Sequence, residues 1–561
     1  MKKNNQLNLY FEDRVDSKKN SNDGRINLVL SCILLFSCII FLRLLILGFN
    51  KVDFAESQTR EDLFFERREI VDSNGIILAK NIIVHDLILR KNKISNINDL
   101  LLKVKINFPS IDFSHIKKEL QNKKIIILKR NLSQSEYNKV ILLGEPALEL
   151  NKRETRIYPQ KNLMAHILGQ VDIDNNGVSG LEFFLDQEIK DKSKLNTPIT
   201  LSIDSTIQFL IRQNLQQGIE DFAAQGAAAI LMDVNTGKIM SMVSLPDFDN
   251  NNRENNSSLL LNKNTKSLFE LGSVFKTFAI ASAIENKVIK KETLFTNLRQ
   301  RVYCGKYPID EYRWDKSKLN LTTQDILVKS SNIGTIEIIK KNGLENHQSF
   351  LEKLELFEYP NIELAEVSKS VKNRWGLCNT LTSGYGHGVN TTLIQFSRAF
   401  AAIVNGGFLV DTSILKDKEI NKKKILNNET SKIMNEILRA NVDKKNKIAG
   451  SGRNADVEGY QVIGKTGTAE KPSRIEKGYS KEIVNVFASA FPEKKPRYVL
   501  SVLIDEPKGA PHIWKHNRRE SGWNAVFIAG KIIQNIGPTL ATNDGELVIS
   551  YQNNINVKKI N

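Results

Sequence analysis

The sequence predicts a membrane-anchored protein of several domains: a mixed α+β region followed by an α/β domain with one antiparallel sheet flanked by helices. Three observations lead to this fold class. Residues 26–49 are nearly all apolar over about the length needed to span a bilayer. The chain has 561 residues, more than one ordinary domain. From about residue 221, strand patterns stand at both ends and helical patterns between them, which indicates one sheet covered by helices.

The apolar segment 26–49 is expected to be a single transmembrane anchor. The polar residues 1–25 before it carry several lysines and arginines, which favours a cytoplasmic N-terminus. A cleaved signal peptide is one alternative, but the polar lead is long and no A-x-A site follows. A buried soluble helix is the other alternative. We therefore expect the rest of the chain to lie outside the cytoplasm.

Composition excludes several classes of protein. The formal charge is +17, but the basic residues are spread along the chain without a long basic run or zinc-finger spacing, so no nucleic-acid partner is expected. The seven histidines show no metal-binding spacing, and no metal or cofactor is expected. Cys32 and Cys38 lie in the apolar segment. Cys304 and Cys378 are expected to be unpaired core thiols, with pairing after export as the alternative.

Residues 50–220 are predicted to form a non-catalytic pedestal domain of α+β type. Residues 50–66 indicate a helical stalk, and 67–80 indicate a hairpin whose turn is Asn-Gly. Short apolar strands such as KIIILK and polar helices such as SQSEYNKVILLG fill residues 81–150. No cluster of side chains of catalytic type stands out in this region.

Residues 221–540 are predicted to form the catalytic domain. Its first residues indicate two strands joined by an Asn-Thr-Gly turn. Helical patterns follow to about residue 440, and three strand patterns and a final helix, NAVFIAGKIIQNI, complete the domain. The polar residues 541–561 are expected to be a disordered tail.

The first candidate motif is Ser273-x-x-Lys276, at the start of a helical stretch. Residues three apart on a helix share a face, so the amine can lie against the hydroxyl. Serine needs a base to act as a nucleophile, and a lysine supplies one only when burial or a second cation lowers its pKa. The same spacing occurs twice more in the chain, so it identifies nothing by itself.

Two further motifs follow. S-x-N at 330–332 places a hydroxyl and an amide in one tight turn, although a helix-capping loop has the same composition. K-T-G-T at 465–468 ends an apolar strand with an ammonium and two hydroxyls, which suits a carboxylate and supplies the second cation. The order S-x-x-K, S-x-N, K-T-G is the set that defines one active-site cleft in penicillin-recognising serine enzymes.

The chain resembles the class B penicillin-binding proteins over nearly its whole length. Residues 67–79 and 177–182 resemble two motifs of the family's pedestal, and 232–251 resembles the strands that open its transpeptidase domain. The segment 374–407, with its Gly-Tyr-Gly-His-Gly run, and the stretch VLIDEPKG are similar to division-specific, FtsI-type members. One departure is Leu271, where the family usually has proline. It removes no functional group.

The resemblance implies a peptidoglycan D,D-transpeptidase that crosslinks stem peptides of the septal cell wall and that β-lactams acylate. Ser273 would attack the D-Ala-D-Ala carbonyl while Lys276 accepts its proton. Ser330 would pass a proton to the departing D-Ala, and Asn332 would hold the peptide amide. Lys465 would lower the pKa of Lys276.

The remaining site residues would bind the end of the substrate. Thr466, Gly467 and Thr468 would hold its terminal carboxylate. The backbone N–H groups of Ser273 and Thr468 would form the oxyanion hole. The implied location is the inner membrane, with a single span and the catalytic domain in the periplasm.

The resemblance also implies partners. The region 50–220 would bind a membrane glycosyltransferase and other division proteins and would do no chemistry. Exchanging Arg67 and Arg68 for glutamate is then expected to impair division while acylation of the ectodomain by penicillin stays near normal.

Three alternatives stay open. A D,D-carboxypeptidase or β-lactamase-type serine hydrolase has the same three motifs but needs neither an anchor nor a large N-terminal region. A β-lactam sensor would be expected to carry several spanning segments, and an inactive scaffold to have lost a motif residue. Within the family, an elongation-specific transpeptidase is the alternative to a division-specific one.

Overall fold

The computed structural model of the chain describes residues 23–49, 67–252, 254, 256–473 and 478–544. The chain divides into two units, residues 1–65 and residues 66–561. The predicted cytoplasmic tail up to residue 22, the stalk 50–66 and the C-terminal tail from residue 545 lie outside the described residues.

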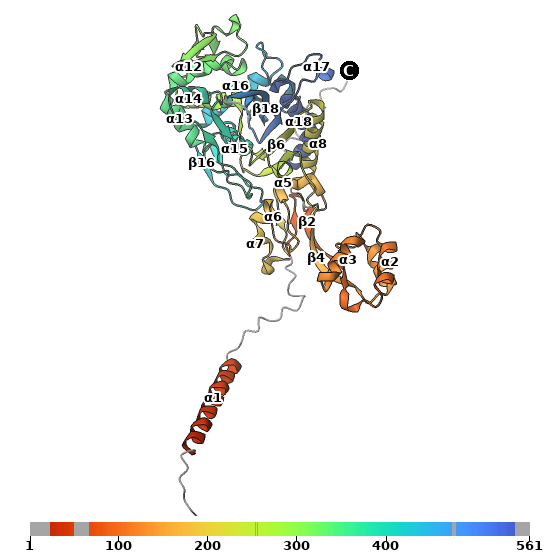
Figure 1. Cartoon of the computed structure of the whole chain (residues 1–561). Coiled ribbons are helices and arrows are strands. Elements are labelled where there is room, and N and C mark those ends of the chain that lie inside the picture. The colour runs from red at the N-terminus through yellow and green to blue at the C-terminus, as the bar shows by residue number, and fades with distance from the viewer. Residues whose placement is uncertain (1–22, 50–66, 253, 255, 474–477, 545–561) are drawn as a thin grey trace, which may run out of the picture. The chain divides into compact units, whose positions relative to one another are not determined.

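The described part of the first unit is one helix, α1 (Asp23–Phe49), drawn in red in Figure 1. The side chains described in it, at residues 27–43, are all exposed. In the described residues, no helix has both the length and the apolar character needed to cross a membrane. The anchor expected at residues 26–49 stays a prediction.

The second unit begins with the predicted hairpin. Strands β1 (Ile70–Val71) and β2 (Ile77–Arg90) pair in antiparallel fashion. The turn between them contains Gly75, whose φ of +84° favours glycine. Asp72 supports the turn, because its carboxylate accepts two backbone N–H groups, those of Asn74 and of residue 76, each at 2.8 Å.

The rest of the pedestal follows the apolar patterns of its sequence. Strands β3 and β4 pair with β2, and β5 pairs in parallel with β1. Helix α4 begins at a capping box formed by Ser133 and Glu136. The predicted strand KIIILK and helix SQSEYNKVILLG are confirmed. The elements are β3 (Ile125–Lys129), β4 (Leu148–Ile157), β5 (Ile199–Thr200), α2 (Ile97–Asn107), α3 (Phe113–Asn122), α4 (Gln134–Leu143), α5 (Ala165–Leu168), α6 (Gly180–Phe184) and α7 (Asp186–Ile189).

Arg67 and Arg68 are buried rather than exposed. Arg67 donates to the carboxylates of Glu182 (2.5 Å) and Asp186 (2.6 Å), and Glu182 also accepts from Arg156 (2.7 Å). Breaking a buried ion pair by removing one partner costs about 3–5 kcal/mol. Exchange of Arg67 for glutamate would therefore disturb the packing of the pedestal itself, so a loss of division in that variant would not report on partner binding alone.

The second part of this unit is built on one five-stranded antiparallel sheet, as predicted. Because β19 pairs with β6, strands from the two ends of the domain meet inside the sheet. The predicted Asn-Thr-Gly turn joins β6 to β7, with Gly237 at φ +67°. In sheet order the strands are β17 (Ile463–Pro472), β18 (Tyr479–Phe491), β19 (Tyr498–Asp505), β6 (Gly226–Asp233) and β7 (Ile239–Leu245).

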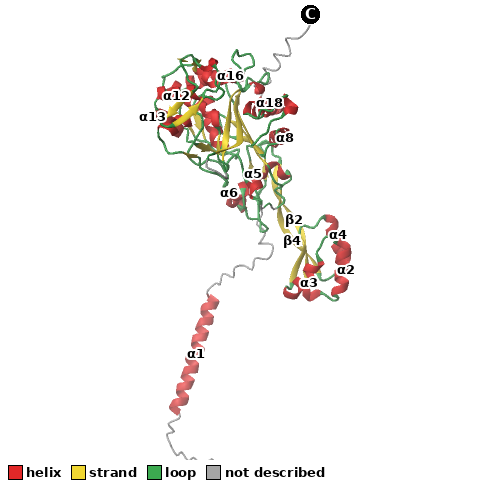
Figure 2. Ribbon diagram, turned by 45° about the horizontal axis from the view of Figure 1, so that its top comes forward, coloured by secondary structure: helices red, strands yellow, loops and turns green. Residues whose placement is uncertain are grey.

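Helices cover both faces of this sheet, and Figure 2 shows the yellow strands between them. Alternate residues of β6 point to opposite cores: Ala229 packs with α8 and α18, and Ile230 packs with α10 and α15. The helices are α8 (Ser205–Asp221), α9 (Ser257–Leu260), α10 (Lys276–Glu285), α11 (Thr323–Val328), α12 (Asn332–Asn342), α13 (Leu344–Lys353), α14 (Leu377–Ser383), α15 (Leu393–Val404), α16 (Asn428–Val442), α17 (Pro511–Trp514) and α18 (Ala525–Asp544).

Short strands connect these helices. Strand β14 lies between β13 and β8, and β10 forms a hairpin with β11. The bounds are β8 (Phe269–Glu270), β9 (Leu294–Phe295), β10 (Arg301–Cys304), β11 (Tyr307–Asp310), β12 (Leu321–Thr322), β13 (Val371–Lys372), β14 (Val389–Thr391), β15 (Phe408–Val410) and β16 (Lys422–Lys424).

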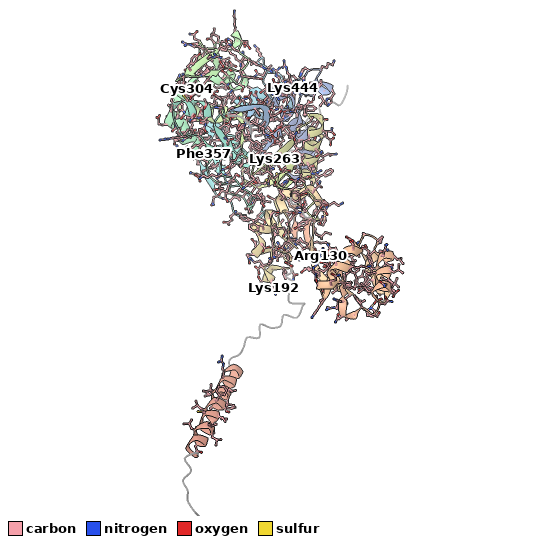
Figure 3. All side chains as sticks on the ribbon, in the orientation of Figure 1. Arg130, Lys192, Lys263, Cys304, Phe357 and Lys444 are labelled. Atoms are coloured by element: carbon pink, nitrogen blue, oxygen red, sulfur yellow. A yellow bond between two sulfur atoms is a disulfide. The ribbon has the colours of Figure 1, made fainter. Side chains whose placement is uncertain are left out.

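Cys304 and Cys378 form a disulfide, so the expectation of two unpaired thiols is wrong. Cys304 ends β10 and is labelled in Figure 3, and Cys378 lies in α14. The two residues are 74 positions apart in sequence, but their Cα atoms are 5.5 Å apart. Only the packing of the hairpin beside α14 brings the sulfurs together.

Candidate active site

The predicted nucleophile Ser273 lies in a 3₁₀ turn, Gly272–Phe275, that leads into α10. Residues three apart in such a turn are eclipsed, so Lys276 follows Ser273 on the same side. Gly272 has φ +62°, and a Cβ there would lie 2.5 Å from the carbonyl oxygen of Thr468. The turn therefore lies directly against β17, the strand that carries the third motif.

Lys276 is fully buried. Its Nζ lies 2.5 Å from the carbonyl oxygen of Ser330, 2.7 Å from Asn332 Oδ1 and 3.2 Å from Ser330 Oγ. Burial, and after it the charge of Lys465, lower the Lys276 pKa well below its ordinary value. A neutral amine has two hydrogens and one lone pair. The two carbonyl oxygens can take the hydrogens, which leaves the lone pair to accept a proton.

Ser330 lies in the loop between α11 and α12, and Asn332 is the first residue of α12. Ser330 has φ +54°, a conformation that costs about 1–3 kcal/mol for a residue with a Cβ and that occurs often at active sites. Its Oγ lies 3.2 Å from Lys276 Nζ and 3.1 Å from Lys465 Nζ, so one hydroxyl joins two amines. The middle residue, Ser331, is the N-cap of α12. The same loop therefore caps α12 through Ser331 and supplies Ser330 to the candidate active site.

A buried ion pair that no sequence motif marks supports this loop. The Glu311 carboxylate accepts hydrogen bonds from the Ser331 hydroxyl (2.6 Å) and from the backbone N–H groups of residues 332 and 333 (3.2 and 3.1 Å). Lys318 Nζ lies 3.2 Å from the same carboxylate. Glu311 therefore positions the start of α12, and with it Asn332.

Lys465, on β17, is also fully buried. Its Nζ donates to the Thr466 carbonyl (3.0 Å) and to Ser330 Oγ (3.1 Å). Burial lowers its pKa to about 7. The Thr466 hydroxyl lies 2.6 Å from the Ser451 hydroxyl. Like Glu311, Ser451 contacts a site residue but belongs to none of the three motifs.

Thr468 is exposed two residues further along the strand. Its hydroxyl donates to Asn485 Oδ1 (2.9 Å) and accepts the N–H of Ser521 (3.2 Å). Since a hydroxyl has a single hydrogen, Thr468 can donate to a carboxylate only by releasing Asn485. Position 467, between the two threonines, has no room for a side chain, because a Cβ there would lie 2.0 Å from the carbonyl oxygen of Leu271. Glycine is therefore required at this position.

The structure thus gathers all the predicted site residues at one place. Hydrogen bonds connect Lys276, Ser330, Asn332, Lys465 and Thr466. Ser273, Gly467 and Thr468 join them through the contact of the nucleophile turn with β17. In the part of the chain that the structure describes, no three His, Cys, Asp or Glu side chains form a group that could hold a metal.

Lys465→Ala is expected to change the pH dependence of acylation by a β-lactam. Lys276 must be neutral to accept a proton, so the rate rises with pH through the Lys276 pKa. Lys465 must be charged to attract a carboxylate, so the rate falls above the Lys465 pKa of about 7. Removing Lys465 should abolish the falling limb and move the rising limb to higher pH, because one repelling charge is gone.

The rising limb should move only part of the way toward the pKa of an ordinary lysine, because burial, which the substitution leaves in place, is the largest cause of the lowered Lys276 pKa. The measurement is the second-order acylation constant between about pH 5 and pH 10 for the wild type and the variant. An unchanged profile would show that Lys465 does not act on Lys276.

Thr468→Val is expected to weaken the reaction with β-lactams that carry a carboxylate. The variant loses the hydroxyl and keeps the backbone N–H. One hydrogen bond to a charged group is worth about 1.5–3 kcal/mol, or roughly ten- to a hundredfold in acylation efficiency. Thr236→Val, in the exposed β6–β7 turn, is a matched control. Equal acylation by wild type and Thr468→Val would remove Thr468 from the carboxylate site.

Comparison with known proteins agrees with this geometry. The family model described as "Penicillin binding protein transpeptidase domain" matches residues 227–533. The family model described as "Penicillin-binding Protein dimerisation domain" matches residues 65–195. The chain is similar to the probable peptidoglycan D,D-transpeptidase FtsI of Caulobacter vibrioides, at 30% identity over 84% of this chain and 81% of that protein. It is also similar to the peptidoglycan D,D-transpeptidase FtsI of Buchnera aphidicola, at 27% identity over 90% and 94% of the two chains.

Among solved structures, penicillin-binding protein 3 of Mycobacterium tuberculosis superposes with a TM-score of 0.65 at 22% identity, over 84% of this chain and 96% of that one. That likeness shows the fold. The transpeptidase match spans more than half of the chain, and the Caulobacter protein is similar over most of its length. The chain therefore belongs to the penicillin-binding protein transpeptidase family, as a class B member of the FtsI type.

Proposed function

We propose that this protein is a peptidoglycan D,D-transpeptidase that crosslinks stem peptides of the septal cell wall through a serine acyl-enzyme. The observation that carries the proposal is the pair of buried lysines joined by one serine hydroxyl, beside the turn of Ser273. Two buried amines of lowered pKa beside a serine suit a nucleophile and its base. The names of the FtsI relatives support peptidoglycan as the substrate and division as the process.

In the acylation step, Ser273 Oγ attacks the carbonyl between the two D-alanines, and Lys276 takes the serine proton. The developing oxyanion is held by the backbone N–H groups of Ser273 and Thr468. Ser330, which lies between the two amines, passes a proton to the departing D-Ala. Asn332 holds the peptide amide of the donor strand. A β-lactam takes the same path and stays attached.

In binding, the free carboxylate of the terminal D-Ala lies against Thr466, Gly467 and Thr468. Lys465 supplies the positive charge nearest to that carboxylate. The acceptor is the amine of a neighbouring stem peptide, which displaces Ser273 from the acyl group and forms the crosslink.

The proposal is tested by covalent labelling. The full-length protein is incubated with a fluorescent penicillin, digested, and the labelled peptide is identified by mass spectrometry. The label is expected on Ser273 alone. A label on another serine would overturn the assignment, and release of D-Ala without transfer to an amine would identify a hydrolase instead.

We also propose an inner-membrane location with one span at residues 26–49, a cytoplasmic N-terminus and a periplasmic catalytic domain. The apolar sequence and the basic residues before it support the span. The Cys304–Cys378 disulfide supports an oxidising compartment for the catalytic domain. In membranes, the mature protein should begin at or near Met1 and resist carbonate extraction. A new N-terminus just beyond residue 49 would contradict the anchor.

The partners proposed for the pedestal are a membrane glycosyltransferase and other division proteins. Because Arg67 and Arg68 are buried, an exposed apolar residue is the better probe, and Leu142 at the end of α4 is 86% exposed. Leu142→Glu should impair division while leaving the melting temperature and penicillin acylation unchanged. Normal division would exclude this surface from partner binding.

A further inference from the structure

A second group of polar side chains lies next to the nucleophile turn, away from the two lysines. Glu270, three residues before Ser273 in sequence, is buried. Its Oε1 accepts the hydroxyl of Tyr479 (2.9 Å) and the N–H of Gly388 (3.0 Å). His387 Nδ1 lies 3.2 Å from the Tyr479 oxygen and 3.5 Å from Glu270 Oε2. None of these side chains has a role in the acylation step described above.

The contacts of Tyr479 decide which nitrogen of His387 carries the proton. Burial and the charge of Glu270 raise the Tyr479 pKa, so its hydroxyl keeps its single hydrogen. That hydrogen points to the Glu270 carboxylate, which has none to give. The Tyr479 oxygen can therefore only accept from His387, and Nδ1 is the donor. In the neutral imidazole, Nε2 is left with a free lone pair.

The group lies on segments that contact the nucleophile turn. A Cβ on Gly386, which has φ +85°, would lie 2.4 Å from the Gly272 carbonyl oxygen, so the loop of His387 runs directly against the residue before Ser273. Tyr479 belongs to the same hairpin as K-T-G-T, because it pairs with Pro472 of β17. The His387 side chain is 45% exposed, and Glu270 behind it is 7% exposed. A buried carboxylate thus supports an accessible imidazole on the loop that contacts the nucleophile turn.

The second half of the reaction needs a base at this place. An alkyl amine is mostly protonated at neutral pH and attacks only as the free amine. As its nitrogen bonds to the acyl carbon, the C–O bond to Ser273 breaks. One proton of the nitrogen must leave, and the Ser273 oxygen must gain one. A positioned base near the attacking nitrogen contributes typically 10²–10⁴-fold.

We propose that His387 is the general base for the acceptor amine, and that Tyr479 and Glu270 are positioning residues that fix its tautomer. His387 Nε2 takes one proton from the attacking nitrogen and releases it to solvent. Lys276, which has passed the first serine proton to D-Ala through Ser330, takes one proton from solvent and gives it to Ser273 as the ester bond breaks, so the amide, the free serine and a neutral lysine are formed. The proposal rests on the proposed transpeptidase function and assigns its acceptor half-reaction.

Among the described residues, two rings and one carboxylate contact the His387 side chain. Tyr385 stacks on its ring with centroids 6.4 Å apart, Tyr479 lies at 5.4 Å, and Glu270 is the charged group in contact. Glu470 acts on Tyr479 from further away.

The test uses the full-length protein with an N-acyl-D-alanyl thioester as donor and D-alanine as acceptor. Transfer and hydrolysis products are quantified together, and acylation by a fluorescent penicillin is measured separately. His387→Gln is expected to lower the ratio of transfer to hydrolysis by roughly a hundred- to ten-thousandfold. Tyr479→Phe should give a smaller loss, because the imidazole stays but its tautomer is no longer fixed. His512→Gln, at an exposed histidine of α17, is the matched control.

Chemical rescue tests whether His387 acts as a base or only contributes to packing. Added imidazole should restore transfer in His387→Ala and do nothing for the wild type. An unchanged transfer ratio in His387→Gln, or equal losses of transfer and penicillin acylation, would overturn the proposal while leaving the transpeptidase function in place. If the wild type itself neither binds penicillin at Ser273 nor transfers to D-alanine, the proposed function has failed instead.

Discussion

Lys276→Met is expected to lower the second-order constant for penicillin acylation by about 10²–10⁴-fold, the usual contribution of a general base. Its Nζ is the buried amine that contacts Ser330 and Asn332, and no other amine of lowered pKa follows Ser273 in the same turn. Methionine has a similar length and no proton to exchange. The melting temperature of the variant should equal or exceed that of the wild type. Burying an amine costs free energy, and burying a thioether does not.

The control is Ser273→Ala, which should show no covalent label at any pH. A Lys276→Met protein that folds and acylates at the wild-type rate would exclude Lys276 as the base. Lys465 would then be the remaining candidate, since its pKa is lowered to about 7 and its Nζ contacts the same Ser330 hydroxyl.

Glu311→Ala is expected to destabilise the transpeptidase domain by about 3–5 kcal/mol. The substitution leaves Lys318 buried without its carboxylate and removes the acceptor for the Ser331 hydroxyl and for two backbone N–H groups. The loop of Ser330 and Asn332 loses its support, so acylation should fall together with stability. Thermal unfolding and the acylation constant are the measurements.

The double variant Glu311→Ala/Lys318→Met tests the cause. It contains no unpaired buried charge, so part of the lost stability should return. Acylation should stay low, because the N–H groups at the start of α12 still lack their acceptor. An unchanged melting temperature in Glu311→Ala alone would contradict the role of this ion pair.

Elements that depend on neighbours in sequence could be predicted. Alternation of apolar residues and the turn at Gly75 are local, and they identify the pedestal hairpin and the strands of the sheet. The order of S-x-x-K, S-x-N and K-T-G identified the site, since the family resemblance assigns these residues to one cleft. Composition likewise gave no reason to expect a nucleic-acid partner, and it showed the apolar segment near the N-terminus.

The support of the site depended on contacts between residues far apart in the chain. Cys304 meets Cys378 across 74 positions, and Glu270 meets Tyr479 across 209. No local pattern encodes such pairs, because each residue alone is compatible with solvent, a cap or a core. The burial of Arg67 illustrates the same limit, since its sequence resembles an exposed basic pair and its partners lie more than a hundred residues away.

By itself, then, the sequence determined which functional groups this protein has, their order, and the local elements that carry them. Only the tertiary structure decided their chemical state. Lys276 and Lys465 have lowered pKa values because the packed domain removes water from both amines and sets them against one Ser330 hydroxyl. His387, which lies in the turn before β14, acquires a defined tautomer because Tyr479 of β18 and Glu270 of β8 contact it. Desolvation and long-range hydrogen bonding exist only after the chain has folded, so no stretch of sequence contains them.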